Sequence, residues 1–131
     1  GMHGFMDPFN RGTFYENDKK TYHDLKIMTD LRSRERALQT GYAMYFAVNE
    51  NVLAIVRFIA GGHDAFGEKG ENKAFLMLVN PSSKEERAAF DLRTKREGVP
   101  YQAHNALIQY LSDPVVHEKI GPYDYKILEL V

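Results

Sequence analysis

The amino-acid sequence predicts a mainly β fold, an antiparallel β-sandwich preceded by one α-helix. Three observations support this prediction. From residue 41 onward, about seven short apolar or alternating segments follow one another at roughly even spacing, a pattern typical of such sandwiches. Before residue 41, one stretch has a helical period. The chain has 131 residues, of which 44% are hydrophobic and 27% charged, which is ordinary for about one globular domain.

The composition excludes several classes of protein. Seventeen Lys and Arg against eighteen Asp and Glu give a net charge of −1, which provides no electrostatic footprint for nucleic acid or for an anionic membrane surface. The chain has no cysteine, so disulfides and cysteine-based metal or redox sites are excluded. It lacks an apolar run of about 18 residues that could cross a membrane. A barrel enzyme of about 250 residues does not fit in this length, and the compartment stays undetermined.

The predicted helix covers residues 18–38. Asn17 can cap it with its side-chain oxygen, and Asp18 places a negative charge in the first turn. No Gly or Pro interrupts the span, and three arginines crowd its last turns. Its apolar stripe recurs at three-residue steps and consists of Tyr22, Leu25, Met28 and Leu31.

The predicted strands follow from Gly41 onward, where the hydrophobic period changes. Turn-forming residues 49–51 join the first two strands into a hairpin, and a glycine-rich loop over residues 61–70 leads to the third. Residues 93–100 are charged and are expected to form a loop. The segments interpreted as strands are residues 42–48, 52–59, 75–79, 88–92, 106–111, 115–116 and 123–130.

Few residues carry a recognisable catalytic pattern. The glycine-rich loop lacks the spacing of a phosphate-binding loop, and we expect a flexible hairpin connection. His63 and Asp64 within it could bind a metal weakly, but exposure to solvent is the favoured interpretation. No nucleophile stands in a catalytic motif. The sequence therefore predicts no catalytic residue, no metal site and no cofactor.

Asp7 and Arg11 form the most suggestive polar pair. They lie four residues apart around Pro8, so that one turn can bring them together. A carboxylate accepts hydrogen bonds from sugar hydroxyls and a guanidinium donates to them. The same spacing suits a structural ion pair within the turn, which the spacing alone favours over ligand binding.

Four stretches resemble the α-amylase family, glycoside hydrolase family 13, in the order in which that family carries them. Residues 4–14 resemble its Gly-x-x-Asp-Pro-x-Asn-Arg-x-x-Phe motif after the last barrel strand. Residues 31–41 resemble its Leu-Arg-x-x-x-x-Ala-Leu-x-x-Gly motif at the end of the eighth barrel helix. Residues 75–80 and 120–128 resemble strands of its C-terminal β domain. The form is most similar to the neopullulanase, cyclomaltodextrinase and amylopullulanase branch.

This resemblance implies that the chain is the C-terminal piece of a glycosidase acting on α-glucans with α-1,4 or α-1,6 bonds. Residues 1–40 would be the last loop and eighth helix left over from a (β/α)8 barrel, and residues 41–131 the C-terminal β-sandwich. The catalytic carboxylates would lie upstream, so the isolated chain is expected to be inactive. Asp7 and Arg11 match the family positions that contact glucose units of the substrate.

Two other classes of function stay open beside this reading. The sixteen aromatic residues, eight Tyr and eight Phe, allow a carbohydrate-binding module, and an exposed apolar patch would point to a non-catalytic interaction domain. The expected partners are the upstream barrel of the parent enzyme and an α-glucan oligosaccharide. A homodimer through the helix over residues 18–38 is a further expectation, because that helix would have lost its barrel.

Overall fold

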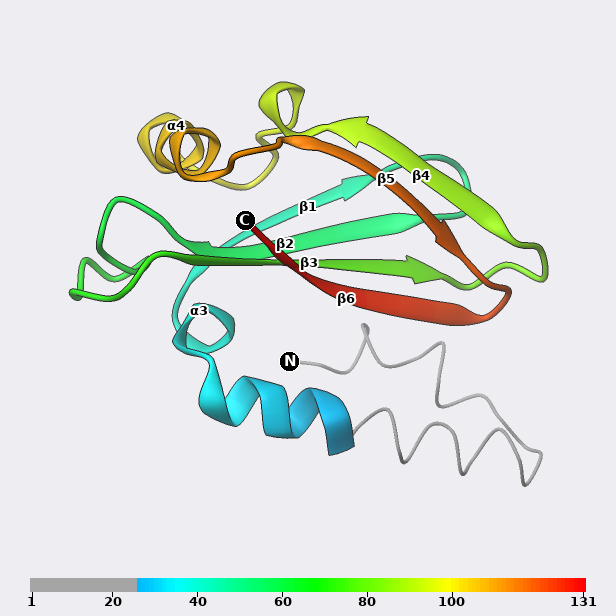
Figure 1. Cartoon of the computed structure of the whole chain (residues 1–131), viewed down its shortest axis with the longest axis horizontal. Coiled ribbons are helices and arrows are strands. Elements are labelled where there is room, and N and C mark those ends of the chain that lie inside the picture. The colour runs from blue at the N-terminus through cyan, green and yellow to red at the C-terminus, as the bar shows by residue number, and fades with distance from the viewer. Residues whose placement is uncertain (1–25) are drawn as a thin grey trace. The chain divides into compact units, whose positions relative to one another are not determined.

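The computed structural model describes residues 26–131, which fall into two units with a boundary after Glu35 (Figure 1). In the first unit, the described residues 26–34 form an α-helix. The second unit, residues 36–131, carries six strands and two α-helices among the described residues. Each unit is described separately below.

The helix of the first unit ends earlier than the sequence predicts. Residues 26–34 are helical as expected, but Glu35 is not, and a separate short helix begins at Arg36. In the last turn the Ser33 hydroxyl donates to the carbonyl oxygen of Asp30 at 2.8 Å, and Arg34 Nε donates to the same oxygen at 3.3 Å. Such local side-chain bonds compete with continuation of a helix. The predicted part over residues 18–25 lies outside the described residues.

The second unit consists of two antiparallel sheets. The larger sheet has the strand order β1-β2-β3-β6 and the smaller one pairs β4 with β5. The strands are β1 (Tyr42–Ala47), β2 (Leu53–Ile59), β3 (Lys73–Asn80), β4 (Glu86–Asp91), β5 (Val115–Ile120) and β6 (Asp124–Leu130). A 3₁₀ turn, η1 (Leu92–Thr94), and a helix, α4 (Tyr101–Tyr110), connect β4 to β5.

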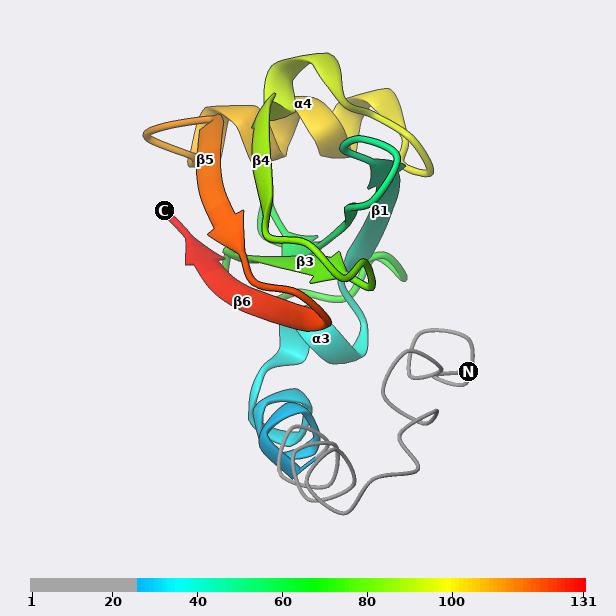
Figure 2. The ribbon, with the colours of Figure 1, turned by 90° about the vertical axis from the view of Figure 1, so that its right-hand side faces the viewer.

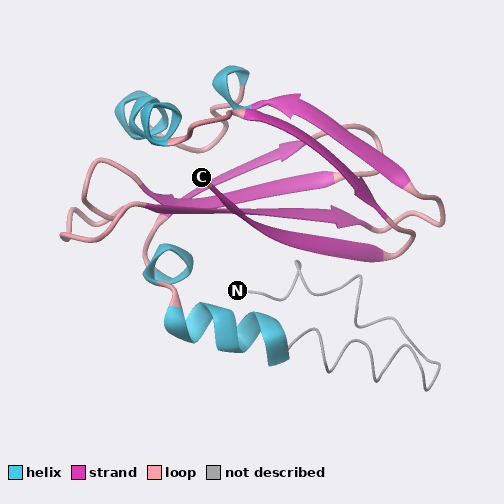
Figure 3. Cartoon of the chain, viewed as in Figure 1, coloured by secondary structure: helices cyan, strands magenta, loops and turns pink. Residues whose placement is uncertain are grey.

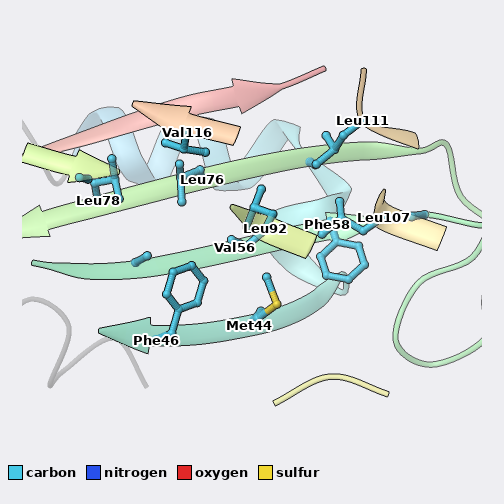
Figure 4. Close-up of a cluster of buried hydrophobic side chains, with 14 of the residues drawn as sticks. Met44, Phe46, Val56, Phe58, Leu76, Leu78, Leu92, Leu107, Leu111 and Val116 are labelled. Atoms are coloured by element: carbon cyan, nitrogen blue, oxygen red, sulfur yellow. The ribbon is translucent and has the colours of Figure 1, made fainter. Parts of the chain in front are cut away.

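The two sheets and α4 enclose the main core. Figures 1 and 2 show β4 and β5 lying over one face of the larger sheet, with α4 beside them at one end. Met44, Val56 and Leu76 are register neighbours across three strands, and all three are fully buried on this face. Leu92 and Leu107 close the core from η1 and α4 (Figure 4). Burial of such side chains stabilises the fold by about 2 kcal/mol each.

The opposite face of the larger sheet carries a second, smaller cluster. Here α3 (Arg36–Gln39) packs Ala37 against Ile59 and Phe75. Gly41 follows α3 and leads into β1. A Cβ atom at Gly41 would lie 2.6 Å from the carbonyl oxygen of Phe58 and closer still to that of Ala37, so only glycine fits there. The close approach fixes where α3 meets the sheet.

The predicted strand over residues 106–111 is wrong, because these residues belong to α4 and its C-terminal end (Figure 3). Ala103, Leu107 and Leu111 are buried at four-residue steps, which is the spacing of one helix face. The apolar run that suggested a strand is the second half of this pattern. The first half, residues 101–105, follows the predicted loop over residues 93–100 and carries no predicted element.

The prediction of a mainly β chain with antiparallel sheets is confirmed. The hairpin of β1 and β2 forms across the expected turn, where Asn49 Oδ1 accepts from the backbone N–H groups of Asn51 and Val52 at 2.8 and 3.0 Å. The strands expected around residues 75–79, 88–92 and 123–130 also form. The brief strand expected at residues 115–116 extends to Ile120 as β5.

Candidate functional site

The two residues predicted to bind substrate, Asp7 and Arg11, lie outside the described residues. The pair therefore stays a prediction. Within residues 26–131, no three His, Asp or Glu side chains gather closely enough to hold a metal ion. In the same part of the chain, no helix is both long and apolar enough to cross a membrane.

The glycine-rich connection between β2 and β3 is built around a buried carboxylate. The side chain of Asp64 is only 1% exposed, and its Oδ1 accepts from the backbone N–H groups of Phe66 and Glu68, both at 2.9 Å. These bonds turn the chain sharply, and Gly67 between the two donors takes a positive φ of 83°. The expectation of a solvent-exposed Asp64 is therefore wrong, because the loop folds around this side chain.

Arg36 ties this loop to α3. Its Nη2 lies 3.2 Å from Asp64 Oδ2, and its Nη1 donates to the carbonyl oxygen of Lys69 on the far side of the loop. The backbone N–H of Ala65 donates to the carbonyl oxygen of Thr40 at 3.0 Å. The sequence gives no sign of this arrangement, since Arg36 and Asp64 are 28 residues apart.

The Asp64 carboxyl is an ionised structural group. Burial raises its pKa, but the Thr40 hydroxyl beside it, hydrogen bonds from the amides of Glu68 and Phe66, and the Arg36 guanidinium outweigh burial and lower the pKa to about 2 from 3.8. A general acid needs a proton near neutral pH, and this carboxyl has lost its proton well below that range. Asp64 therefore holds the loop in shape and has no proton to transfer.

His63, the other residue singled out in this loop, is exposed. Its Nδ1 lies 3.0 Å from the carbonyl oxygen of Asp64 and 3.4 Å from the hydroxyl of Tyr42, whose ring meets the imidazole edge to face. The imidazole thus has protein partners on the loop and on β1. Among the described residues, His63 belongs to no group of three or more side chains that could hold a metal ion.

A second feature is an exposed group of side chains beside the edge of β1, which we call the tyrosine patch: Tyr45, Arg96, Glu97 and Tyr101. The loop after η1 runs along β1, where the Tyr45 backbone N–H donates to the carbonyl oxygen of Glu97 at 3.4 Å. Gly98, with a φ of 89°, lets this loop pass close to the Tyr45 ring. The Arg96 guanidinium lies 5.5 Å from the centre of the Tyr101 ring. Tyr45 and Tyr101 are 54% and 66% exposed.

Sequence reasoning missed the tyrosine patch. Tyr45 is one member of an alternating strand and Tyr101 follows a charged segment, so neither carries a motif. Their proximity depends on the loop between β4 and α4 crossing beside β1, which no local pattern encodes. The one available signal was Gly98, since a glycine inside a charged stretch often marks a turn or a close approach.

The chain is similar to amylopullulanases, which are enzymes of glycoside hydrolase family 13. It is 31% identical to the amylopullulanase of Thermoanaerobacterium thermosulfurigenes and 30% identical to that of Thermoanaerobacterium saccharolyticum, in each case over 105 residues and 78% of the chain. It is 26% identical to the amylopullulanase of Thermoanaerobacter thermohydrosulfuricus over 133 aligned residues and 98% of the chain.

The similarity concerns a small part of each relative. The chain spans 6%, 8% and 9% of the length of these three amylopullulanases. No protein-family profile matches the chain, and no solved structure matches it. The expected relation to glycosidases of the α-amylase family is thus confirmed at the level of weak homology over most of the chain.

Proposed function

We propose that this chain is the C-terminal part of an α-glucan-cleaving enzyme of the α-amylase family. In this proposal residues 41–131 are the C-terminal β-sandwich domain, and residues 1–40 are the last barrel loop and the eighth barrel helix. The observation that carries the proposal is the homology to amylopullulanases over most of the chain. The neopullulanase-like branch is part of the same proposal.

The role of the chain in the parent enzyme is structural and substrate-binding. Asp7 and Arg11 contact glucose units of the glucan, and the upstream barrel supplies the catalytic carboxylates. The structural role of Asp64 supports a location of the catalytic carboxylates upstream of this chain. The buried Asp64 side chain is ionised and holds the loop in shape. Arg36 and Gly41 join α3, at the end of the proposed barrel segment, to the β domain.

Substitution of Asp7 or Arg11 by alanine is expected to weaken catalysis by the parent enzyme. In a polypeptide that includes the upstream barrel, each change should lower kcat/KM for maltooligosaccharides by roughly 10- to 100-fold, the effect of losing one or two hydrogen bonds to a charged group. Steady-state kinetics on maltoheptaose measures this directly.

The matched controls for this experiment are Asp91→Ala and Arg93→Ala. These two residues form an exposed ion pair at the start of η1, with Arg93 Nη2 2.6 Å from Asp91 Oδ2. Their loss should leave kcat/KM within about twofold. Unchanged kinetics in the Asp7 and Arg11 variants would remove them from the substrate site, and an upstream region without a barrel and its carboxylates would contradict the proposed function.

The alternative of a carbohydrate-binding module has one observation in its favour, which is the tyrosine patch. A non-catalytic interaction domain and a homodimer through residues 18–38 have no comparable support among the described residues. The carbohydrate-binding alternative is also compatible with the proposed enzyme, because a β domain can bind the same glucan at a distance from the catalytic site. It is therefore developed below as an addition.

A further inference from the structure

We infer that the tyrosine patch binds an α-glucan chain on the surface of the β domain. This inference rests on the proposed function for the choice of ligand, and on the geometry of the described residues for the choice of site. Tyr45 and Tyr101 are exposed although each contains a large apolar ring, and each belongs to a regular element that restricts its position.

The two tyrosines lie close enough to meet one ligand. Tyr45 Cδ2 is 3.9 Å from the position of a Cβ atom at Gly98, and only two residues separate Gly98 from Tyr101. Three Cα–Cα steps reach at most about 11 Å, so the Cα atom of Tyr101 lies within that distance of the Cα atom of Gly98, which passes the Tyr45 ring. An oligosaccharide of a few sugar units spans such a distance, and the inference is that one glucan chain contacts both rings.

The polar groups of the patch complement a neutral sugar. One face of the Tyr101 ring is covered by the Arg96 guanidinium, and the ring is still 66% exposed, which leaves room for a sugar. Arg96 offers several N–H donors in a fixed plane, and the tyrosine hydroxyls both donate and accept. The Glu97 carboxylate accepts hydrogen bonds, although its Oε2 already accepts from the backbone N–H of Arg96 at 3.0 Å. Pyranose rings offer apolar C–H faces to aromatic rings and hydroxyls to these polar groups.

The loop that builds the patch is held in place before any ligand binds. Its residue Val99 donates a backbone hydrogen bond to the carbonyl oxygen of Arg96 at 3.3 Å, and Lys95 lies over the buried ring of Phe46, 5.2 Å from its centre. Preorganisation of this kind reduces the entropy lost on binding. The other strongly exposed aromatics of residues 26–131 are Phe66, in the connection between β2 and β3, and Tyr123, in the turn between β5 and β6.

The experiment is titration of the purified chain with maltoheptaose, followed by calorimetry or by amide chemical shifts. The expected result is saturable binding with a Kd in the range of about 0.1 to 10 mM, accompanied by shifts at residues 45 and 95–101. The double variant Tyr45→Ala/Tyr101→Ala should weaken binding at least tenfold, and Tyr45→Phe/Tyr101→Phe, which keeps both rings, should retain most of it. Circular dichroism verifies that each variant is folded.

The matched control is Tyr123→Ala. Tyr123 is 65% exposed, like Tyr101, but lies in the turn between β5 and β6. Its replacement should leave the Kd unchanged. Absence of binding at about 10 mM maltoheptaose, or a loss in the Tyr123 variant equal to that in the Tyr45 and Tyr101 variant, would overturn this inference. Neither outcome affects the proposed function, which the kinetics of the parent enzyme tests separately.

Discussion

Alanine in place of Asn80 is expected to lower the free energy of unfolding by about 3 kcal/mol. Asn80 ends β3 and is fully buried. Its Nδ2 lies within donating distance of the carbonyl oxygens of Lys84, Ile120 and Gly121, at 2.8, 3.2 and 2.9 Å. Its Oδ1 accepts from the backbone N–H and from the hydroxyl of Ser82, at 3.0 and 2.6 Å.

The large effect follows from the number of groups that one amide satisfies. Removal of the amide leaves the buried carbonyl oxygen of Ile120 and the partly buried ones of Lys84 and Gly121 without this donor, and a buried unsatisfied group costs about 1 to 3 kcal/mol. Urea unfolding followed by circular dichroism measures the change.

The control for Asn80 is Asn72→Ala. Asn72 is exposed and accepts one bond, from the backbone N–H of Gly62 at 2.9 Å, so its loss should cost less than about 1 kcal/mol. Equal effects of the two alanine substitutions would show that Asn80 does not join the ends of β3 and β5 as described.

Replacement of Asp64 by asparagine is expected to destabilise the chain strongly at neutral pH and weakly in strong acid. The variant leaves the Arg36 guanidinium without its ionised partner and removes the charge that draws the loop amides together. The pKa of Asp64 is lowered from 3.8 to about 2 in the folded chain. A carboxyl with a lowered pKa stabilises the fold above its unfolded pKa and loses that contribution as the pH falls through its folded pKa.

The sign of this linkage defines a pH window. The difference in unfolding free energy between the parent chain and Asp64→Asn should be constant above about pH 5 and shrink as the pH falls towards about 2. Urea unfolding at several pH values measures this difference. Asp91→Asn is the matched control: hydrogen bonds from Arg93 also lower the pKa of this carboxyl, but the pair is largely exposed and its loss should have a small effect. A difference for Asp64→Asn that does not change between pH 4 and 2 would contradict the ionised state of Asp64.

Local patterns predicted most of the sheet structure. Alternating or continuous apolar runs such as residues 52–59 correctly indicated strands, because burial of one or both faces of a strand leaves a direct trace in the sequence. The helix α4 was missed because its buried positions Ala103, Leu107 and Leu111 are spread over a segment that also contains polar residues. The four-residue spacing of these buried positions becomes visible only when the whole segment over residues 101–111 is considered.

The described site features depend on contacts that are remote in the sequence. Asp64 is buried because Arg36 from α3 and Thr40 just after it meet this side chain, and a local pattern cannot report a partner 28 residues away. Tyr45 and Tyr101 come together because a loop crosses beside β1. In contrast, Asp7 and Arg11 came from a motif within residues 4–14, which a sequence displays without any knowledge of the fold.

The most direct test of the proposal that the catalytic carboxylates lie upstream of this chain is an assay for hydrolysis by the purified 131-residue chain. Incubated with maltoheptaose and with pullulan, the chain should release no reducing ends above the buffer level, while a polypeptide that includes the upstream barrel should cleave at least one of these substrates. Hydrolysis that co-elutes with the isolated chain, rises in proportion to its concentration and disappears on unfolding would contradict the account, because the catalytic carboxylates would then lie within these residues.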